Sequence, residues 1–315
     1  MLVVAGAMAA DPSAAQPYPA RSIRLIVPFA PGGPNDIIGR TVAQKLNEQW
    51  GQPVVVENRG GAGGTIGLEM ASKLAGDGYV LAVGGSSSLA VAPGLYAKLG
   101  YDPLRDFVPI ANVAVAPYAL AVNPRVPAKD VRELVAVSRA LAGGLTYGTA
   151  GSGSMSHLST ELLRATSGAK LLHVPYKGAA LVATDLIAGQ IDMTINDYAA
   201  LAPFDRVGKL RLLAVAGSRR AAVAPQLPTM AESGISGYAV DTWFGIVAPA
   251  GVPKEIVAQL NAAIVSGIRS ADVRKRFADI GYESIGDTPG EFAATIRTDI
   301  EKFARVIRSA GIRAE

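Results

Sequence analysis

Short β-rich runs alternate with helix-like segments along most of this 315-residue chain. In segment 35–50, Ile38, Val42 and Leu46 recur at four-residue spacing, which is the apolar stripe of an amphipathic helix. Further helices are predicted at 65–74, 129–141, 155–166 and 179–188, and strands at 22–29, 53–57, 79–83, 145–147, 171–174, 191–195 and 210–216. This repeated order predicts an α/β protein with mostly parallel sheets.

Two similar segments indicate where the chain passes between lobes. Residues 119–127 and 245–253 each run from a strand through a Pro-containing loop and a Val-Pro pair into a helix start. We interpret them as two crossings between lobes, although both could be instances of a common α/β connection. Lobe 1 is then predicted to hold residues 21–117 and 243–315, and lobe 2 residues 118–242.

Composition and the first residues narrow the function classes. Half of the residues are apolar, 18% are charged, and the net charge of +4 is spread along the chain, so disorder and a nucleic-acid partner are not expected. The absence of Cys excludes thiol chemistry and suits an exported protein. Residues 1–20 are predicted to be a signal remnant, because an apolar stretch closes on Ala7-Met8-Ala9. A basic n-region is missing, and a disordered apolar terminus is the alternative.

The motifs of common enzyme classes are missing from the sequence. There is no Gly-x-Ser-x-Gly elbow and no P-loop, and in the glycine run 60–67 Ile66 occupies the place of the third small residue of a dinucleotide loop. The two histidines, His157 and His173, have no metal-ligand spacing and are expected to be structural. No catalytic residue, metal site or cofactor is therefore predicted. An α/β cleft enzyme acting on a small organic acid remains the alternative.

Three loops rich in Gly, Ser and Thr each follow a predicted strand and precede a helix, at residues 31–36, 84–88 and 148–154. Such loops lie at the carboxyl edge of a parallel sheet, where ligands bind. Free amides at a helix N-terminus favour an anion, and hydroxyl groups add further donors. Each loop alone could be an ordinary N-cap turn. Together, and divided between the two lobes, they predict a cleft for a small carboxylate held by neutral donors.

Five motifs occur in a fixed order: PGGPND at 31–36, VENRGGAGG at 56–64, GTAGSGS at 148–154, VPYKG at 174–178 and LPTMAESG at 227–234. In order and spacing the sequence resembles the Bug family, the periplasmic solute receptors of tripartite tricarboxylate transporters, almost from end to end. The resemblance implies a type II periplasmic-binding-protein-like fold, a two-lobed Venus flytrap with a hinge of two crossings. It implies a monomeric receptor in the periplasm, not an enzyme, which captures a mono- or dicarboxylate, an aromatic acid or an amino acid. Its partners would be integral-membrane transporter subunits and, in some members, a sensor protein.

Candidate ligand-binding residues come mainly from the three loops. In the first lobe, Phe29 is expected to form an apolar wall and Asp36 to order its loop or hold a water molecule, while the amide nest and the hydroxyl donors are assigned to Ala30, Gly32, Gly33, Pro34, Ser86 and Ser87. In the second lobe, the closing residues are expected to be Thr149, Ala150, Gly153 and Ser154.

Specificity is assigned to Tyr176, Asn196, Asp197 and Asp241, and Lys177 is expected either to pair with the ligand or to be an exposed turn residue. The family often has Asp-Asn where this chain has Asn196-Asp197, and two small hydroxyl residues where it has Asp241-Thr242. Extra acids at the distal end of the cleft would disfavour a polyanion. A monocarboxylate, a zwitterionic amino acid or an amide-bearing ligand is therefore expected in preference to citrate. The alternative is that either acid faces solvent or caps a helix.

Overall fold

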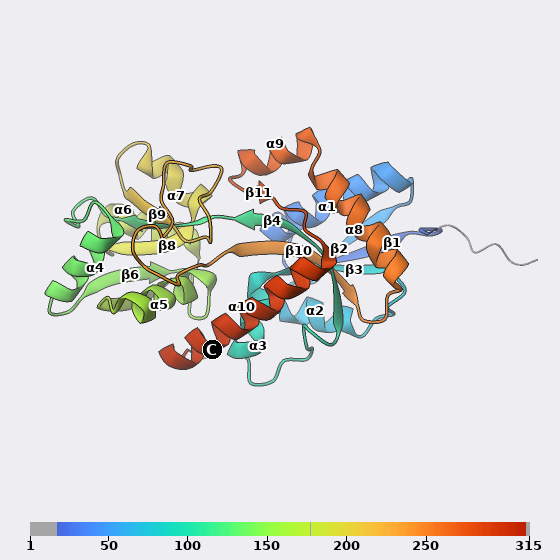
Figure 1. Cartoon of the computed structure of the whole chain (residues 1–315), viewed down its shortest axis with the longest axis horizontal. Coiled ribbons are helices and arrows are strands. Elements are labelled where there is room, and N and C mark those ends of the chain that lie inside the picture. Colours follow the sequence, from blue (N-terminus) through green and yellow to red (C-terminus); the bar gives the residue numbers. More distant parts are fainter. Residues whose placement is uncertain (1–17, 177, 313–315) are drawn as a thin grey trace, which may run out of the picture.

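The computed structural model describes residues 18–176 and 178–312, and shows two α/β units side by side along the long axis of the molecule (Figure 1). Each unit is a twisted sheet covered by helices. The predicted α/β, two-lobed architecture is therefore confirmed. The predicted signal segment lies outside the described residues except for its last three positions, and so does Lys177.

The first sheet has the strand order β11-β4-β10-β3-β1-β2. Its strands are β1 (Ile23–Val27), β2 (Val54–Asn58), β3 (Val80–Gly85), β4 (Phe107–Ala116), β10 (Thr242–Pro249) and β11 (Glu283–Ser284). The helices of this unit are α1 (Pro34–Trp50), α2 (Thr65–Ser72), α8 (Lys254–Ile268), α9 (Ala271–Asp279) and α10 (Pro289–Ala310), with short turns at η1 (Ala62–Gly64), η2 (Ser86–Val91) and α3 (Ala92–Leu95).

The second sheet has the order β7-β6-β8-β5-β9. Its strands are β5 (Tyr118–Val122), β6 (Leu145–Thr149), β7 (Leu171–Pro175), β8 (Met193–Asp197) and β9 (Arg211–Val215), and its helices are α4 (Val131–Ala140), α5 (Met155–Ser167), α6 (Ala179–Ala188) and α7 (Tyr198–Asp205). The predicted parallel pairing holds for β2, β1 and β3 of the first sheet and for β7, β6 and β8 of the second, but not for the pairs made by β10, β11 and β5. β10 runs antiparallel to β3 and β4, and β5 antiparallel to β8 and β9, because these two strands enter from the other unit.

The chain changes sheet twice, and the two crossings lie side by side. β4 ends at Ala116 and β5 begins at Tyr118, with only Pro117 between them. The chain returns between β9 and β10, and Thr242 at the start of β10 pairs with Ala116. The repeated segments 119–127 and 245–253 fall just after each change of sheet, in β5 and β10 and the loops that follow. The lobe boundaries at 117/118 and 242/243 stay a prediction.

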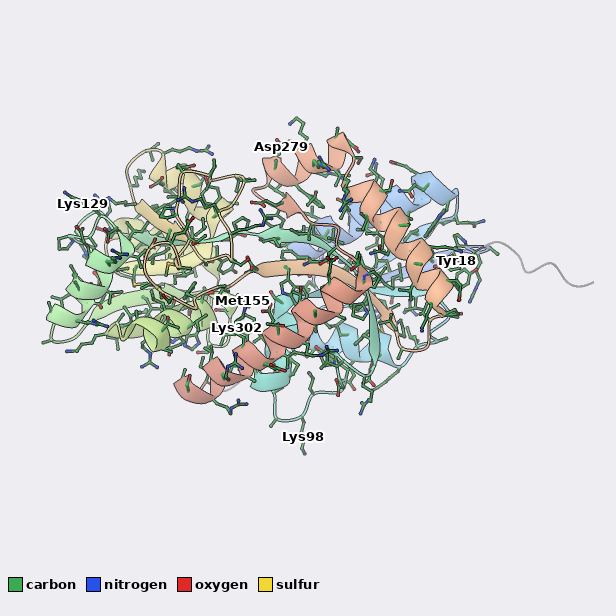
Figure 2. The ribbon with its side chains drawn as sticks, in the orientation of Figure 1. Tyr18, Lys98, Lys129, Met155, Asp279 and Lys302 are labelled. Atoms are coloured by element: carbon green, nitrogen blue, oxygen red, sulfur yellow. The ribbon has the colours of Figure 1, made fainter. Side chains whose placement is uncertain are left out.

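Helix α10 supports the crossing strand β10. Trp243 Nε1 donates to Asp299 Oδ2 at 2.8 Å, and Lys302 Nζ lies 2.6 Å from the other oxygen of that carboxylate. Trp243 is 1% exposed and also meets the edge of Phe292. Figure 2 places Lys302 of α10 and Met155 of α5 at the middle of the molecule, where the two helices contact each other.

Among the helices of the described residues, none is both long and apolar enough to cross a membrane.

Replacing Trp243 by Phe should lower the free energy of unfolding by about 1–3 kcal/mol, because the buried Asp299 carboxylate loses a hydrogen-bond donor. Urea denaturation measures the change. The matched control is Trp50→Phe, which alters a partly exposed indole that packs against Tyr18. Equal losses in the two variants would contradict a special role for the Trp243–Asp299 hydrogen bond.

Candidate functional site

A cavity of about 530 Å³ lies between the two units, within the size range of ligand pockets. The first unit lines it with Phe29, Pro34, Asn35, Gly63, Ser86, Ser87, Val91, Ala92, Leu95 and Tyr96, and with Thr242 and Phe244 of β10. The second unit lines it with Tyr118, Ala150, Gly151, Ser152, Gly153, Ser154 and Met155. We call this cavity the cleft. No charged side chain is among the described residues that line it.

All three predicted loops reach the cleft, but only some of the candidate residues line it. The candidates in its wall are Phe29, Pro34, Ser86, Ser87, Ala150, Gly153 and Ser154. The candidates outside its wall are Ala30, Gly32, Gly33, Asp36, Thr149, Tyr176, Asn196, Asp197 and Asp241. Most residues of the second group form hydrogen bonds within the loops or with other parts of the fold.

Asp36 organises the first loop. Its Oδ2 accepts hydrogen bonds from the Gly32 amide and from Arg40 Nε, both at 2.9 Å. Its Oδ1 accepts from Asn58 Nδ2, which also donates to the Phe29 carbonyl. Burial alone would raise the pKa of Asp36, but these hydrogen bonds hold the pKa at about 2. These contacts agree with the interpretation of Asp36 as a loop organiser.

The second loop is held by its own hydrogen bonds. Ser154 caps α5 by accepting from the His157 amide at 3.3 Å. The Ala150 amide donates to Ser156 Oγ at 2.9 Å, and the Gly153 amide donates to His157 Nδ1 at 3.1 Å. Two amides that we expected to be free for a ligand are therefore occupied in this structure. These hydrogen bonds fix the conformation of the loop.

The two histidines form a stacked pair beneath this loop. Their ring centroids lie 4.0 Å apart at 12°, and the Tyr147 ring stacks on His173 with centroids 5.0 Å apart and lies 6.4 Å from His157. Thr149 Oγ1 lies 2.6 Å from His173 Nε2. Burial lowers the pKa of both rings, that of His157 to about 4. Both are neutral at pH 7, as His157 must be to accept from the Gly153 amide. The sequence predicted structural histidines but not their position at the two ends of the loop.

The residues assigned to specificity lie outside the cleft. Tyr176 donates to Asp185 at 2.8 Å, and Asn196 Oδ1 accepts from the Asp197 amide. Asp197 caps α7 by accepting from the Ala199 amide, and burial raises the pKa of its carboxyl.

Asp241 accepts from the Ser218 amide and lines a separate cavity of about 220 Å³ that also contains Asn112 and Asp287. Neither Asp197 nor Asp241 is among the described residues that line the cleft, and each accepts a hydrogen bond from a backbone amide elsewhere.

Several cleft residues were missed by the sequence reasoning. The polar ones are Asn35, which lies inside the recognised PGGPND motif, Ser152, which lies inside the second loop, Tyr96, and Tyr118 and Thr242, which flank the crossings. Tyr118 and Thr242 could have been predicted from their positions beside the crossings, because a ligand between two lobes lies next to the strands that join them. Within the described parts of the chain, no group of three or more His, Asp or Glu side chains could hold a metal ion.

Comparison with known proteins gives full-length matches. The family model described as tripartite tricarboxylate transporter family receptor matches residues 38–312. Protein BugT of Bordetella pertussis is 37% identical over 313 residues, which cover 99% of this chain and 96% of that protein.

Two solved structures are similar in both sequence and fold. R. palustris Rpa4515 with adipate is 35% identical, has a TM-score of 0.77, and is matched over 94% of this chain and 99% of its own. MatC (Rpa3494) from Rhodopseudomonas palustris with bound malate is 33% identical, has a TM-score of 0.73, and is matched over 92% of this chain and 100% of its own.

The lowered pKa of His157 predicts a pH-dependent stability. Between about pH 6.5 and 4 the unfolded chain takes up a proton at His157 that the folded protein refuses, so stability should fall as the pH is lowered through this window. The slope for one proton is at most about 1.4 kcal/mol per pH unit. Denaturant unfolding at several pH values measures it.

The control for this prediction is His157→Gln, which should lose the part of the slope that His157 contributes, while His173 and the carboxylates keep their own contributions. Taking the difference between the two proteins at each pH removes the contributions of the carboxylates. Identical slopes in the two proteins would show that His157 does not titrate in this window.

Proposed function

The chain belongs to the receptor family of tripartite tricarboxylate transporters, and on this premise we propose that it captures a small carboxylate in the cleft and delivers it to the membrane subunits of such a transporter. Members of this family are periplasmic solute-binding receptors and not enzymes. For this chain we further propose export by a signal peptide, with residues 1–20 as its remnant. The candidate residues that line the cleft are proposed to contact the ligand.

The observation that carries the proposal is the pair of helix N-termini at the cleft. Pro34 is the first residue of α1 and Ser154 is the N-cap of α5, and the two residues line the cavity from opposite units. The positive ends of both helix dipoles favour an anion there. No described carboxylate lines the cleft to oppose it. A ligand carboxylate between the two helices would hold both units together.

The remaining wall suits the hydrocarbon or aromatic body of an organic acid. Phe29, Leu95, Tyr96, Met155 and Phe244 all line the cleft. The related structures named with adipate and with malate support a small organic acid as the ligand class. Apolar contacts would add affinity in proportion to the surface removed from water.

The two units already contact each other at the edge of the cleft. A Cβ atom added at Gly153 would lie 2.8 Å from Leu95 Cδ2, and Gly153 has a φ of +74°, which L side chains rarely adopt. Glycine at this position therefore allows the second loop to close on α3. A larger residue would keep the two units apart.

Thermal unfolding with adipate, malate and benzoate tests the proposal. A ligand at 100 times its Kd should stabilise the wild-type protein by about 2.7 kcal/mol. Gly153→Val should abolish this gain. The matched control is Gly237→Val, because Gly237 has a similar φ of +76° but open space around it. If no carboxylate in a broader panel stabilises the wild-type protein, the proposed function is wrong. If Gly153→Val keeps the full gain, closure does not depend on Gly153.

A further inference from the structure

The two units also contact each other away from the cleft. Glu283 in β11 belongs to the first unit, and its Oε2 lies 2.9 Å from Arg219 Nη2 of the second unit. The other carboxylate oxygen of Glu283 accepts a hydrogen bond from the Ala222 amide, which also belongs to the second unit. The Glu283 side chain is only 10% exposed, whereas that of Arg219 is 61% exposed. We call Glu283, Arg219 and Ala222 the rear latch.

The strand orders place the rear latch and the cleft on opposite sides of the crossing strands. In the first sheet, β4 and β10 lie between β11, which carries Glu283, and the strands β3 and β1, whose following loops line the cleft. In the second sheet, β5 lies between β9, which is followed by the loop with Arg219, and β6, which is followed by the cleft residues 150–155. In Figure 1, α9 and β11 lie above the crossing strands, and α10 meets α5 below them.

The units are not closely packed on the side of the rear latch. The cavity of about 220 Å³ lies there, lined by Trp243, Glu283 and Thr295 from the first unit and by Val215 and Arg219 from the second. Protein interiors are otherwise packed as densely as organic crystals. The latch therefore joins the units at the wall of a cavity, and it can break without opening a packed core between them.

Rotation about the crossings couples the rear latch to the cleft. The chain joins the units at the two crossings, so the units move relative to each other as a hinge about these strands. A rotation that brings the cleft loops together moves the loops on the other side of the hinge apart. In the arrangement seen here the latch is formed, so further closure of the cleft has to lengthen it. The latch thus stabilises the more open arrangement.

We propose that Glu283 and Arg219 are positioning residues, which set the ligand affinity of the cleft by opposing its closure. This inference rests on the proposed function, because it requires a ligand that binds the closed cleft. When only a fraction of the molecules is closed, the apparent Kd is the intrinsic Kd divided by that fraction. Weakening the latch raises the closed fraction and lowers the apparent Kd, although neither side chain is among the described residues that line the cleft.

Calorimetry with adipate, malate and benzoate tests the effect on affinity. In Glu283→Gln and in Arg219→Ala, a carboxylate that binds the wild-type protein should bind about 3- to 10-fold tighter. The two variants change the net charge in opposite directions, so a gain in both is not a long-range effect of charge on an anionic ligand. Arg219→Lys retains the cation and should keep an affinity close to that of the wild-type protein.

The matched control for the affinity is Arg220→Ala. Arg220 lies in the same loop as Arg219, and its Nε is 2.9 Å from Glu232 Oε2, which belongs to the same unit. This variant therefore loses an ion pair of the same length without losing a contact between the units. Its affinity should equal that of the wild-type protein.

Distances in the ligand-free protein give an independent test. Because the chain has no Cys, Lys98→Cys and Ala165→Cys introduce two spin labels at exposed positions, one after α3 and one in α5. Electron paramagnetic resonance then measures the distance between the units on the side of the cleft. Glu283→Gln should add a population with shorter distances, whereas Arg220→Ala should give the wild-type distribution.

The outcomes separate the inference from the proposed function. An unchanged affinity or an unchanged distance distribution in Glu283→Gln would overturn the inference and leave the carboxylate receptor standing. Weaker binding in the two latch variants would also overturn it, because the latch would then stabilise the closed cleft. An equal gain in Arg220→Ala would assign the effect to the loop and not to the contact between the units. If no carboxylate binds the wild-type protein, the proposed function fails, while the distances still test the latch.

Discussion

The pairing of the two crossing strands is the constraint on which the rest of the structure depends. Ala116 at the end of β4 pairs with Thr242 at the start of β10, so both connections between the units pass through one ladder. Pro117 is the single residue between β4 and β5, and its carbonyl accepts from the Tyr198 amide at the start of α7. Because the first connection is a single residue and the second, through residues 216–241, ends in the same ladder, the loop ends of the two sheets face each other. The cleft follows from that geometry.

Side chains alternate between two faces along β10, so that one face lines the cleft and the other packs against α10. Thr242 and Phe244 face the cleft, whereas Trp243 faces α10 and bonds to Asp299. Gly245 also faces α10, and a Cβ atom there would lie 2.2 Å from Phe292 Cζ, so glycine allows the close approach of helix and strand. One strand thus carries the wall of the cleft on one face and its main support on the other. A one-residue slip of β10 would exchange the two faces.

Local signals in the sequence predicted α1, α2, α4, α5 and α6, most strands and the three loops, because periodicity, glycines and N-cap residues act over a few positions. They did not predict α7, α9 or the long helix α10. The antiparallel course of β5 and β10 could not be predicted in this way, since the partners of each strand are distant in the sequence. The same holds for Asp241, whose hydrogen-bond partner, the Ser218 amide, is 23 residues away. Asn35 lies inside a recognised motif, yet only the fold shows that its amide oxygen is buried without a partner. Sequence reasoning therefore found the loops of the cleft better than the individual side chains that face it.

The cleft combines a neutral wall with loops that are already ordered. His157 and Ser156 hold two amides of the second loop, and Asp36 holds the first, so little conformational entropy remains to be lost when a ligand binds. The attraction of a helix N-terminus for an anion falls off within its first turn. Under the proposed function, a carboxylate is then favoured only where it fits between α1 and α5, and selection among carboxylates depends on the rest of the ligand.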